Sequence, residues 1–227
     1  MSDTYKNSLT SCPHDGDILD YYKGCFESVY VLLHPFISSS TIDFKTRTPE
    51  TWPRKKEMIS ECEEVSWKEV MKLAGFNSLS EIDVGLRTSI GGLKKDFSND
   101  DFSERIQRLF DEKGISQDTE GDLQELLANR LFGALRDAGC TKLWVSNEFG
   151  DEKFFYSIDD IVTGDMLPPS ANVYDEANSF LITTHWDSHC SFLCGSEEFL
   201  KNILKIEPFE GFFCTPKTKV YWGLHEV

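Results

Sequence analysis

The apolar pattern of this chain changes its period at Gly139, and that change constrains the fold more than any other feature of the sequence. Between Ser66 and Ala138 apolar residues recur at helical spacing, most clearly over 123–135. After Gly139 the spacing becomes two, which is typical of strands. The alternating segments are 142–149, 152–157, 179–185 and 189–194. Helices followed by strands predict an α+β fold.

Local start and stop signals delimit the expected helices. Ser66 with Glu69 forms a capping box, and Gly75 ends the helix that it opens. Asn99 or Asp100 begins a helix that stops at Gly114. The remaining predicted helices cover 80–90, 122–138 and 196–205, with a single turn at 157–162.

The strands organise the rest of the chain. Segment 28–34 is β-branched and apolar, so we expect a buried strand that joins the later sheet. Gly150-Asp151 is the expected turn of one hairpin, and short strands are expected near 211–214 and 220–222. Residues 38–53 are rich in Ser, Thr and Pro, which favours an exposed connection.

These elements predict one α+β domain over residues 25–227. Its helical middle segment packs on a mainly antiparallel sheet formed largely by the C-terminal half, because short connections favour antiparallel neighbours. Residues 1–24 are polar and are expected to form an N-terminal arm.

The acidity of the chain limits its partners. Its formal net charge of −16 argues against non-specific binding of nucleic acid or of an anionic membrane, since both require an excess of Lys and Arg. Eleven acids and one base lie between Leu143 and Leu200, a density that favours a basic protein partner. The alternative is that the acids only keep the protein soluble. The acids expected in solvent-facing turns or element ends, and hence to bind the partner, are Asp159, Asp160, Asp175, Glu176 and Asp187.

Seven cysteines without regular spacing indicate reduced thiols rather than a secreted disulfide framework. The N-terminus carries no readable signal peptide, and the longest apolar stretch, 29–33, is far too short to cross a bilayer. We therefore expect a cytoplasmic protein.

None of the specific phosphate-binding, dinucleotide-binding or nucleophile-elbow motifs is present in the sequence. The nearest glycine-rich segment, 90–95, follows a predicted helix rather than a strand, so we interpret it as a helix stop.

The most unusual constellation is the predicted hairpin around His185 and His189. A two-residue turn would place His185 opposite Cys190, whereas a three-residue loop would place His185 directly opposite His189. The three-residue loop separates apolar and polar residues better between the two faces, so the sequence favours adjacent histidines. His185 and His189 are then candidate metal ligands for a divalent cation or, with Asp187, candidate catalytic residues.

His34 or His225 would complete such a site. The alternative is a pair of hairpin-tip histidines that are hydrogen-bonded to backbone and water.

Three stretches, 29–36, 184–189 and 210–214, carry a resemblance to an uncharacterised family of Bacillus-type bacteria, a domain of unknown function. The resemblance implies a bacterial, cytoplasmic origin and assigns no catalytic residue. The acidity and the late hairpins are also similar in type to immunity proteins that neutralise basic nuclease toxins, an analogy that assigns no function by itself.

The sequence thus favours a non-enzymatic, immunity-like protein-binding module without a cofactor. The alternative is a metal- or histidine-dependent enzyme of hydrolase type that uses the His185/His189 hairpin. The expected partner is a basic protein rather than nucleic acid or a membrane, and the sequence leaves the oligomeric state open.

Overall fold

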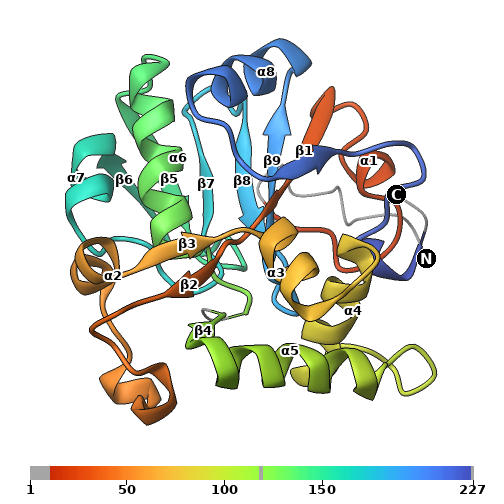
Figure 1. Ribbon diagram of the computed structural model, residues 1–227. Helices are drawn as coiled ribbons and strands as arrows, with labels where there is room; N and C mark the ends of the chain where they lie inside the picture. Colours follow the sequence, from red (N-terminus) through yellow and green to blue (C-terminus); the bar gives the residue numbers. More distant parts are fainter. Residues whose placement is uncertain (1–10, 118–119, 226–227) are drawn as a thin grey trace.

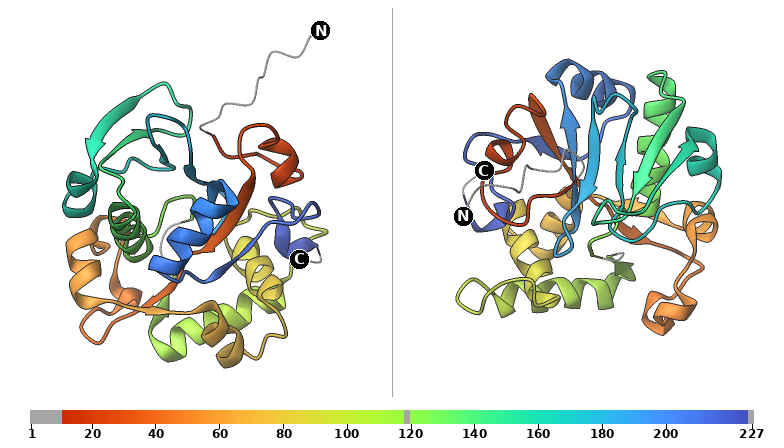
Figure 2. Two further views of the ribbon diagram at one scale, coloured as in Figure 1. Left: turned by 90° about the horizontal axis from the view of Figure 1, so that it is seen from above. Right: turned by 180° about the vertical axis from the view of Figure 1, so that it is seen from behind.

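A seven-stranded antiparallel sheet forms the centre of the computed structural model, which describes residues 11–117 and 120–225. The strand order is β10-β1-β9-β8-β7-β5-β6. The strands are β1 (Ser28–Leu33), β5 (Lys142–Ser146), β6 (Lys153–Ser157), β7 (Asn172–Tyr174), β8 (Leu181–Thr184), β9 (Cys190–Gly195) and β10 (Gly211–Phe213). Seen from behind in Figure 2, these strands lie side by side, and most come from the C-terminal half. The expected α+β architecture is confirmed.

Helices cover both faces of this sheet, because both faces are apolar. The helices are α1 (Ile18–Tyr21), α2 (Lys55–Glu61), α3 (Trp67–Ala74), α4 (Leu79–Ser89), α5 (Asp100–Lys113), α6 (Glu125–Asp137), α7 (Ile158–Thr163) and α8 (Glu197–Ile206). Val31 faces a core shared with α1 and α3–α5, while its neighbour Leu32 faces a second core shared with α6–α8. Figure 1 shows α4 and α5 below the sheet, at the end where the β8–β9 hairpin turns.

Helices α3 and α5 begin and end where the capping signals predict. The Ser66 and Asn99 side chains accept hydrogen bonds from the amides of Glu69 and Phe102, at the N-termini of α3 and α5. Gly75 and Gly114 end these two helices in the left-handed conformation, with φ of 69° and 64°.

A small second sheet was not predicted. Its strands, in the order β3-β2-β4, are β2 (Phe36–Ser38), β3 (Glu63–Val65) and β4 (Ile115–Ser116). The predicted connection 38–53 includes the last residue of β2 and the short 3-10 helices η1 (Phe44–Thr46) and η2 (Pro49–Thr51). Strands of two or three residues are too short to show a period in the sequence.

The favoured register of the β8–β9 hairpin was wrong. Thr184 pairs with Ser191. The same register places His185 opposite Cys190 and not opposite His189. Both faces of the two strands are buried, so the separation of polar from apolar residues does not discriminate between registers. The Ser188 amide donates to the carbonyl of His185 at 3.1 Å and closes the short turn.

Two predicted segments near the termini also differ. Residues 1–10 of the expected arm lie outside the described residues, but 11–24 form no loose arm, because Ile18 and Tyr22 are buried in the core. The predicted strand at 220–222 is instead a turn leading into the 3-10 helix η3 (Trp222–Leu224). Its Trp222 ring packs against Trp67 and Phe212, and such non-local contacts override a short β-prone stretch.

Among the helices in the described residues, none is long and apolar enough to cross a membrane.

Candidate functional site

Buried polar side chains gather where the β8–β9 hairpin turns. Polar groups are rarely buried unless hydrogen bonds or ion pairs replace the lost water. Here the ends of several strands and one residue pair of α4 bring many buried polar side chains together. These side chains belong to His34, Asp83, Arg87, Ser146, Asn172, Thr183, Thr184, His185, Ser188, His189 and Ser191. This polar cluster is the most unusual feature of the interior.

Arg87 is the hub of the polar cluster. Its Nε donates to both carboxylate oxygens of Asp83, at 3.1 and 3.0 Å, and both side chains are almost completely buried. Its other nitrogens donate to the carbonyls of Asp187 at 2.6 Å and Val220 at 3.2 Å. The guanidinium also lies 4.8 Å from the centre of the Tyr221 ring. Arg87 therefore ties α4 to the hairpin turn and to the C-terminal segment.

Sequence analysis missed this pair. Asp83 and Arg87 are four residues apart within an apolar stretch, a spacing that is visible in the sequence. The same spacing occurs on exposed helix faces, so only the packing reveals that the pair is buried. Burial raises the pKa of Asp83, although the Arg87 charge opposes that shift.

His34, at the end of β1, forms a serine–histidine arrangement. His34 Nε2 lies 2.7 Å from Ser191 Oγ, which lies 2.6 Å from Thr184 Oγ1. Burial, reinforced by the neighbouring His189, lowers the pKa of His34 to about 3. Ser191 is fully buried, so its hydroxyl faces other side chains rather than solvent. The arrangement is a structural hydrogen-bond chain.

His185 is engaged by backbone on both ring nitrogens. Its Nδ1 accepts from the Asp187 amide at 3.1 Å, so Nε2 carries the proton and donates to the His14 carbonyl at 3.1 Å. Burial and the Arg87 charge lower the pKa of His185 to about 4. The imidazole is therefore neutral and has no lone pair left for a metal.

His189 does not join His185. The ring of His189 is buried, and burial with the nearby Arg87 charge lowers its pKa to about 3. His225 lines a different cavity, away from His189. Across 11–117 and 120–225, no group of three or more His, Cys, Asp or Glu side chains is placed to hold a metal ion. The donor set that the sequence suggested for a divalent cation does not converge. We refer to His34, His185 and His189 as the buried histidines.

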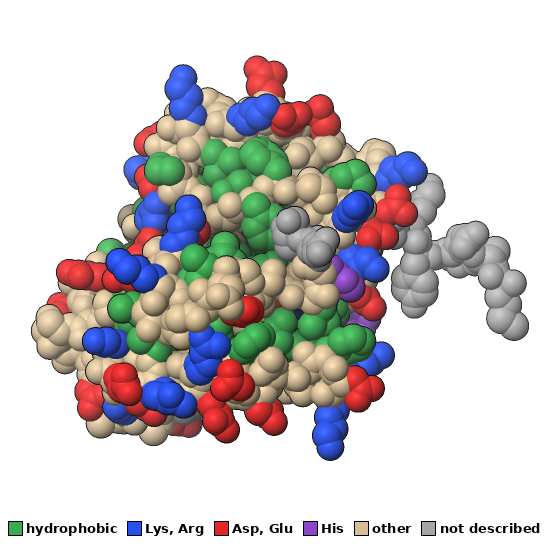
Figure 3. Space-filling model, turned by 45° about the vertical axis from the view of Figure 1, so that its right-hand side comes forward, with side chains coloured by type: hydrophobic (Ala, Val, Ile, Leu, Met, Phe, Trp, Pro, Cys, Tyr) green, Lys and Arg blue, Asp and Glu red, His purple; other side chains and the backbone are tan. Residues whose placement is uncertain are grey.

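The five acids chosen as partner-binding residues do not form one surface. Asp159, Asp160, Asp175 and Glu176 lie at one end of the sheet, beyond the C-terminal end of β7 and at the start of α7. Asp187 lies at the opposite end, in the β8–β9 turn. On the face drawn in Figure 3, acidic side chains are interspersed with lysines and arginines.

Three of these acids already have intramolecular partners. Asp159 forms an ion pair with Arg136 at 3.6 Å, and the Asp160 carboxylate accepts from the hydroxyl of the α7 cap, Ser157, at 2.6 Å. Asp175 accepts from the amide and hydroxyl of Ser179, both at 2.6 Å. Solvent-facing acids at helix and turn ends thus also stabilise those ends.

The β5–β6 hairpin exposes aromatic side chains that sequence analysis could not place. Phe149 is 82% exposed, Phe154 53% and Phe155 41%; we call these three residues the edge aromatics. Every second aromatic side chain of a strand is buried only where helices or another sheet cover that face of the strand. β6 is the last strand of the sheet, and neither of its faces is fully covered. Edge position, which the sequence does not show, decides their exposure.

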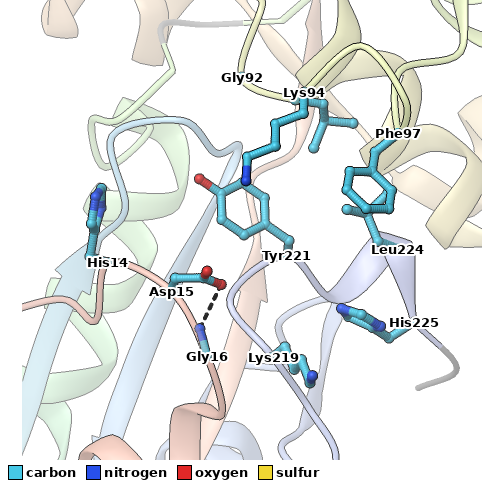
Figure 4. Close-up of a pocket in the computed structure, with 11 residues that line it drawn as sticks. His14, Asp15, Gly16, Gly92, Lys94, Phe97, Lys219, Tyr221, Leu224 and His225 are labelled. Atoms are coloured by element: carbon cyan, nitrogen blue, oxygen red, sulfur yellow. Dashed lines mark hydrogen bonds between the residues drawn. The ribbon is translucent and has the colours of Figure 1, made fainter.

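A cavity of about 550 Å³ opens beside the hub (Figure 4). Segments 14–16, 92–97 and 219–225 line it, and Tyr221, held by Arg87, forms part of its wall. The expected helix stop at 90–95 is confirmed, since Gly91 adopts a φ of 72° directly after α4. Gly92 and Lys94 of that segment face the cavity.

Comparison with known proteins gives the family of the chain. A protein of Bacillus subtilis (strain 168), "Uncharacterized protein YwbB", is 20% identical over 204 residues, which cover 87% of this chain and 90% of that protein. None of the solved structures matches. The resemblance to an uncharacterised Bacillus-type family is confirmed. Residues 14–224 match the model of one family, so the chain belongs to the family described as "Protein of unknown function (DUF2711)".

Proposed function

We propose that this protein is a protein-binding module that pairs an extended, basic segment of its partner with the free edge of β6. The observation that carries the proposal is the combination of an unpaired strand edge with the edge aromatics. Within the described residues, β6 pairs only with β5. Such an edge offers a row of backbone donors and acceptors to another chain.

The edge aromatics supply the apolar anchor. Phe154 and Phe155 point to opposite faces of β6, since they pair with Val145 and Trp144 of β5. A strand added at this edge would cover part of both rings and also extend the ladder. Phenylalanine has a large apolar surface, and contiguous exposed apolar surface marks interaction sites.

The charges around β6 select the partner. The turn before the strand contains Glu148, Asp151 and Glu152, and α7 directly after it begins with Asp159 and Asp160. An acidic rim of this kind accelerates encounter with a basic partner and disfavours an acidic one. A basic toxin of the kind that immunity proteins neutralise carries the positive charge that this acidic rim would attract.

A defined peptide tests the proposal. The probe is a fluorescein-labelled peptide of alternating Lys and Val with the length of an ordinary strand, and binding is followed by fluorescence anisotropy at low and high salt. The intact protein is expected to bind at low salt, and Phe154→Thr or Glu152→Lys should weaken binding about tenfold.

Matched controls come from exposed residues elsewhere. Phe97→Thr removes a phenylalanine that is 54% exposed outside β6, and Glu104→Lys reverses an exposed acid on α5. Both controls should bind like the intact protein. Equal weakening by test and control variants, or no binding by the intact protein at low salt, would overturn the proposal.

A further inference from the structure

A second cavity, of about 300 Å³, lies between α4, α5 and β4 and is separate from the β6 edge. Its walls include Leu86 and Ile90 on one side and Phe110 and Ile115 on the other. His189 reaches it from the β8–β9 turn. The volume falls at the lower end of the range for small-molecule sites.

His189 lines this cavity with two unused nitrogens. The residue is only 4% exposed, and neither Nδ1 nor Nε2 has a hydrogen-bond partner among the described residues. Its position is fixed from the backbone, since the His34 amide donates to the His189 carbonyl at 3.0 Å. With its pKa lowered to about 3, the ring is neutral and offers one N–H donor and one acceptor nitrogen.

Gln117 lines the same cavity and is also unsatisfied. Its side-chain Nε2 and Oε1 are both buried, and neither finds a partner in the part of the chain that the structure describes. Gln107, on α5, lines the cavity too but is exposed and donates to Asp111 at 3.4 Å. The two glutamines therefore differ in that only Gln117 has unused buried polar atoms.

Unsatisfied buried polar groups are rare in native proteins and call for a bound molecule or water. Here two such side chains line one cavity, whose walls combine apolar and polar side chains. Its charged side chains are Lys45, Asp111 and Glu120, of which Lys45 already binds the carbonyl of Asp111 at 2.6 Å and its carboxylate at 3.9 Å. His189 and Gln117 themselves carry no charge, so they match a neutral ligand.

We propose that this cavity binds a small, planar, uncharged ligand with adjacent hydrogen-bond donors and acceptors, an amide-containing heterocycle of nucleobase type, recognised by His189 and Gln117. The apolar walls would enclose the ring, while the imidazole and the amide would bond to its polar edge. The cavity volume suits one ring system better than a whole nucleotide.

Ligand-observed nuclear magnetic resonance tests the proposal on the intact chain, with uracil as the probe and toluene as a flat probe without hydrogen-bonding groups. Uracil is expected to give saturable binding, and toluene none. His189→Phe and Gln117→Leu should each weaken uracil binding about tenfold or more, as expected for a lost buried hydrogen bond. Asn202→Leu removes an exposed amide side chain on α8, outside the cavity, and should leave binding unchanged.

A measurement on the unsubstituted protein covers the case in which a variant fails to fold. The ring ¹⁵N signals of His189 should shift on addition of uracil, whereas those of exposed His14 should not. If uracil does not saturate and the His189 signals stay fixed, the cavity holds only water and the proposal is wrong. Equal weakening by Asn202→Leu would also overturn it.

Discussion

The Asp83–Arg87 ion pair should dominate the stability of the polar cluster, and Arg87→Met tests this. Methionine keeps a long, flexible side chain but removes the charge and all the donated hydrogen bonds. The Asp83 carboxylate, 2% exposed, would then remain buried without its partner. The carbonyls of Asp187 and Val220 would also lose their donors.

The size of the destabilisation caused by Arg87→Met follows from the burial of the ion pair. Removing one partner of a buried ion pair costs about 3–5 kcal/mol, because the other charge stays desolvated. The lost bonds to two carbonyls add about 1 kcal/mol each, so we expect a loss of about 5–7 kcal/mol. For a chain of this length that corresponds to a fall in Tm of roughly 10–30 °C.

Urea unfolding followed by circular dichroism measures the effect, with a double variant as its test. Asp83→Asn combined with Arg87→Met removes the unpaired charge and should regain about 2 kcal/mol relative to Arg87→Met alone. Lys201→Met breaks the exposed ion pair with Glu197 and should cost less than about 1 kcal/mol.

The pH dependence has a defined sign. Without Arg87, the buried Asp83 carboxyl prefers its neutral form, so its folded pKa lies above the unfolded value. The penalty is then present at high pH and decreases as pH falls and the carboxyl is protonated. The deficit of Arg87→Met relative to the intact protein should therefore be smaller at pH 5 than at pH 8. The reasoning fails if Arg87→Met costs less than about 1 kcal/mol, or if the double variant is no more stable than the single one.

Three further predictions concern stability and reactivity. Burial lowers the pKa values of the buried histidines below their unfolded value. Their contribution to the free energy of unfolding is therefore complete above about pH 6.5 and should fall by about 1 kcal/mol for each histidine between pH 7 and 5.5. Urea midpoints that do not change over that range would contradict this prediction. Gly85→Ala should destabilise the protein by about 1–3 kcal/mol, because the added Cβ would lie 2.7 Å from Ile106 Cδ1. Gly133→Ala in α6 should stabilise the protein, because its added Cβ meets nothing within 4 Å. Thermal unfolding of both variants checks that their effects have opposite signs. Cys190 and Cys194 have pKa values raised by burial and should react with a thiol reagent only on unfolding, and mass spectrometry showing prompt labelling of either thiol in the native protein would refute this.

Local chemistry determined much of the fold from sequence alone. The limits of α3 and α5 follow from Ser66, Gly75, Asn99 and Gly114, because a cap forms hydrogen bonds within a few residues of itself. The turn of the β5–β6 hairpin around Gly150 follows in the same way, with a φ of 71° that glycine adopts without strain. No tertiary contact is needed to predict any of these features.

The tertiary structure decided how the candidate sites are assembled. Asp83 and Arg87 show the spacing of an ordinary helical pair, and only the packing of α4 under the hairpin makes that pair a buried hub. The register of the β8–β9 hairpin separates His185 from His189. Residue alternation did not specify that register, because both faces of the two strands are buried. His189 and Gln117 line one cavity although they are far apart in sequence, and the edge aromatics face solvent because β6 has no further strand beside it among the described residues. A sequence pattern reports local period and polarity, whereas burial, strand-edge position and the satisfaction of a polar atom depend on which distant segments pack against it.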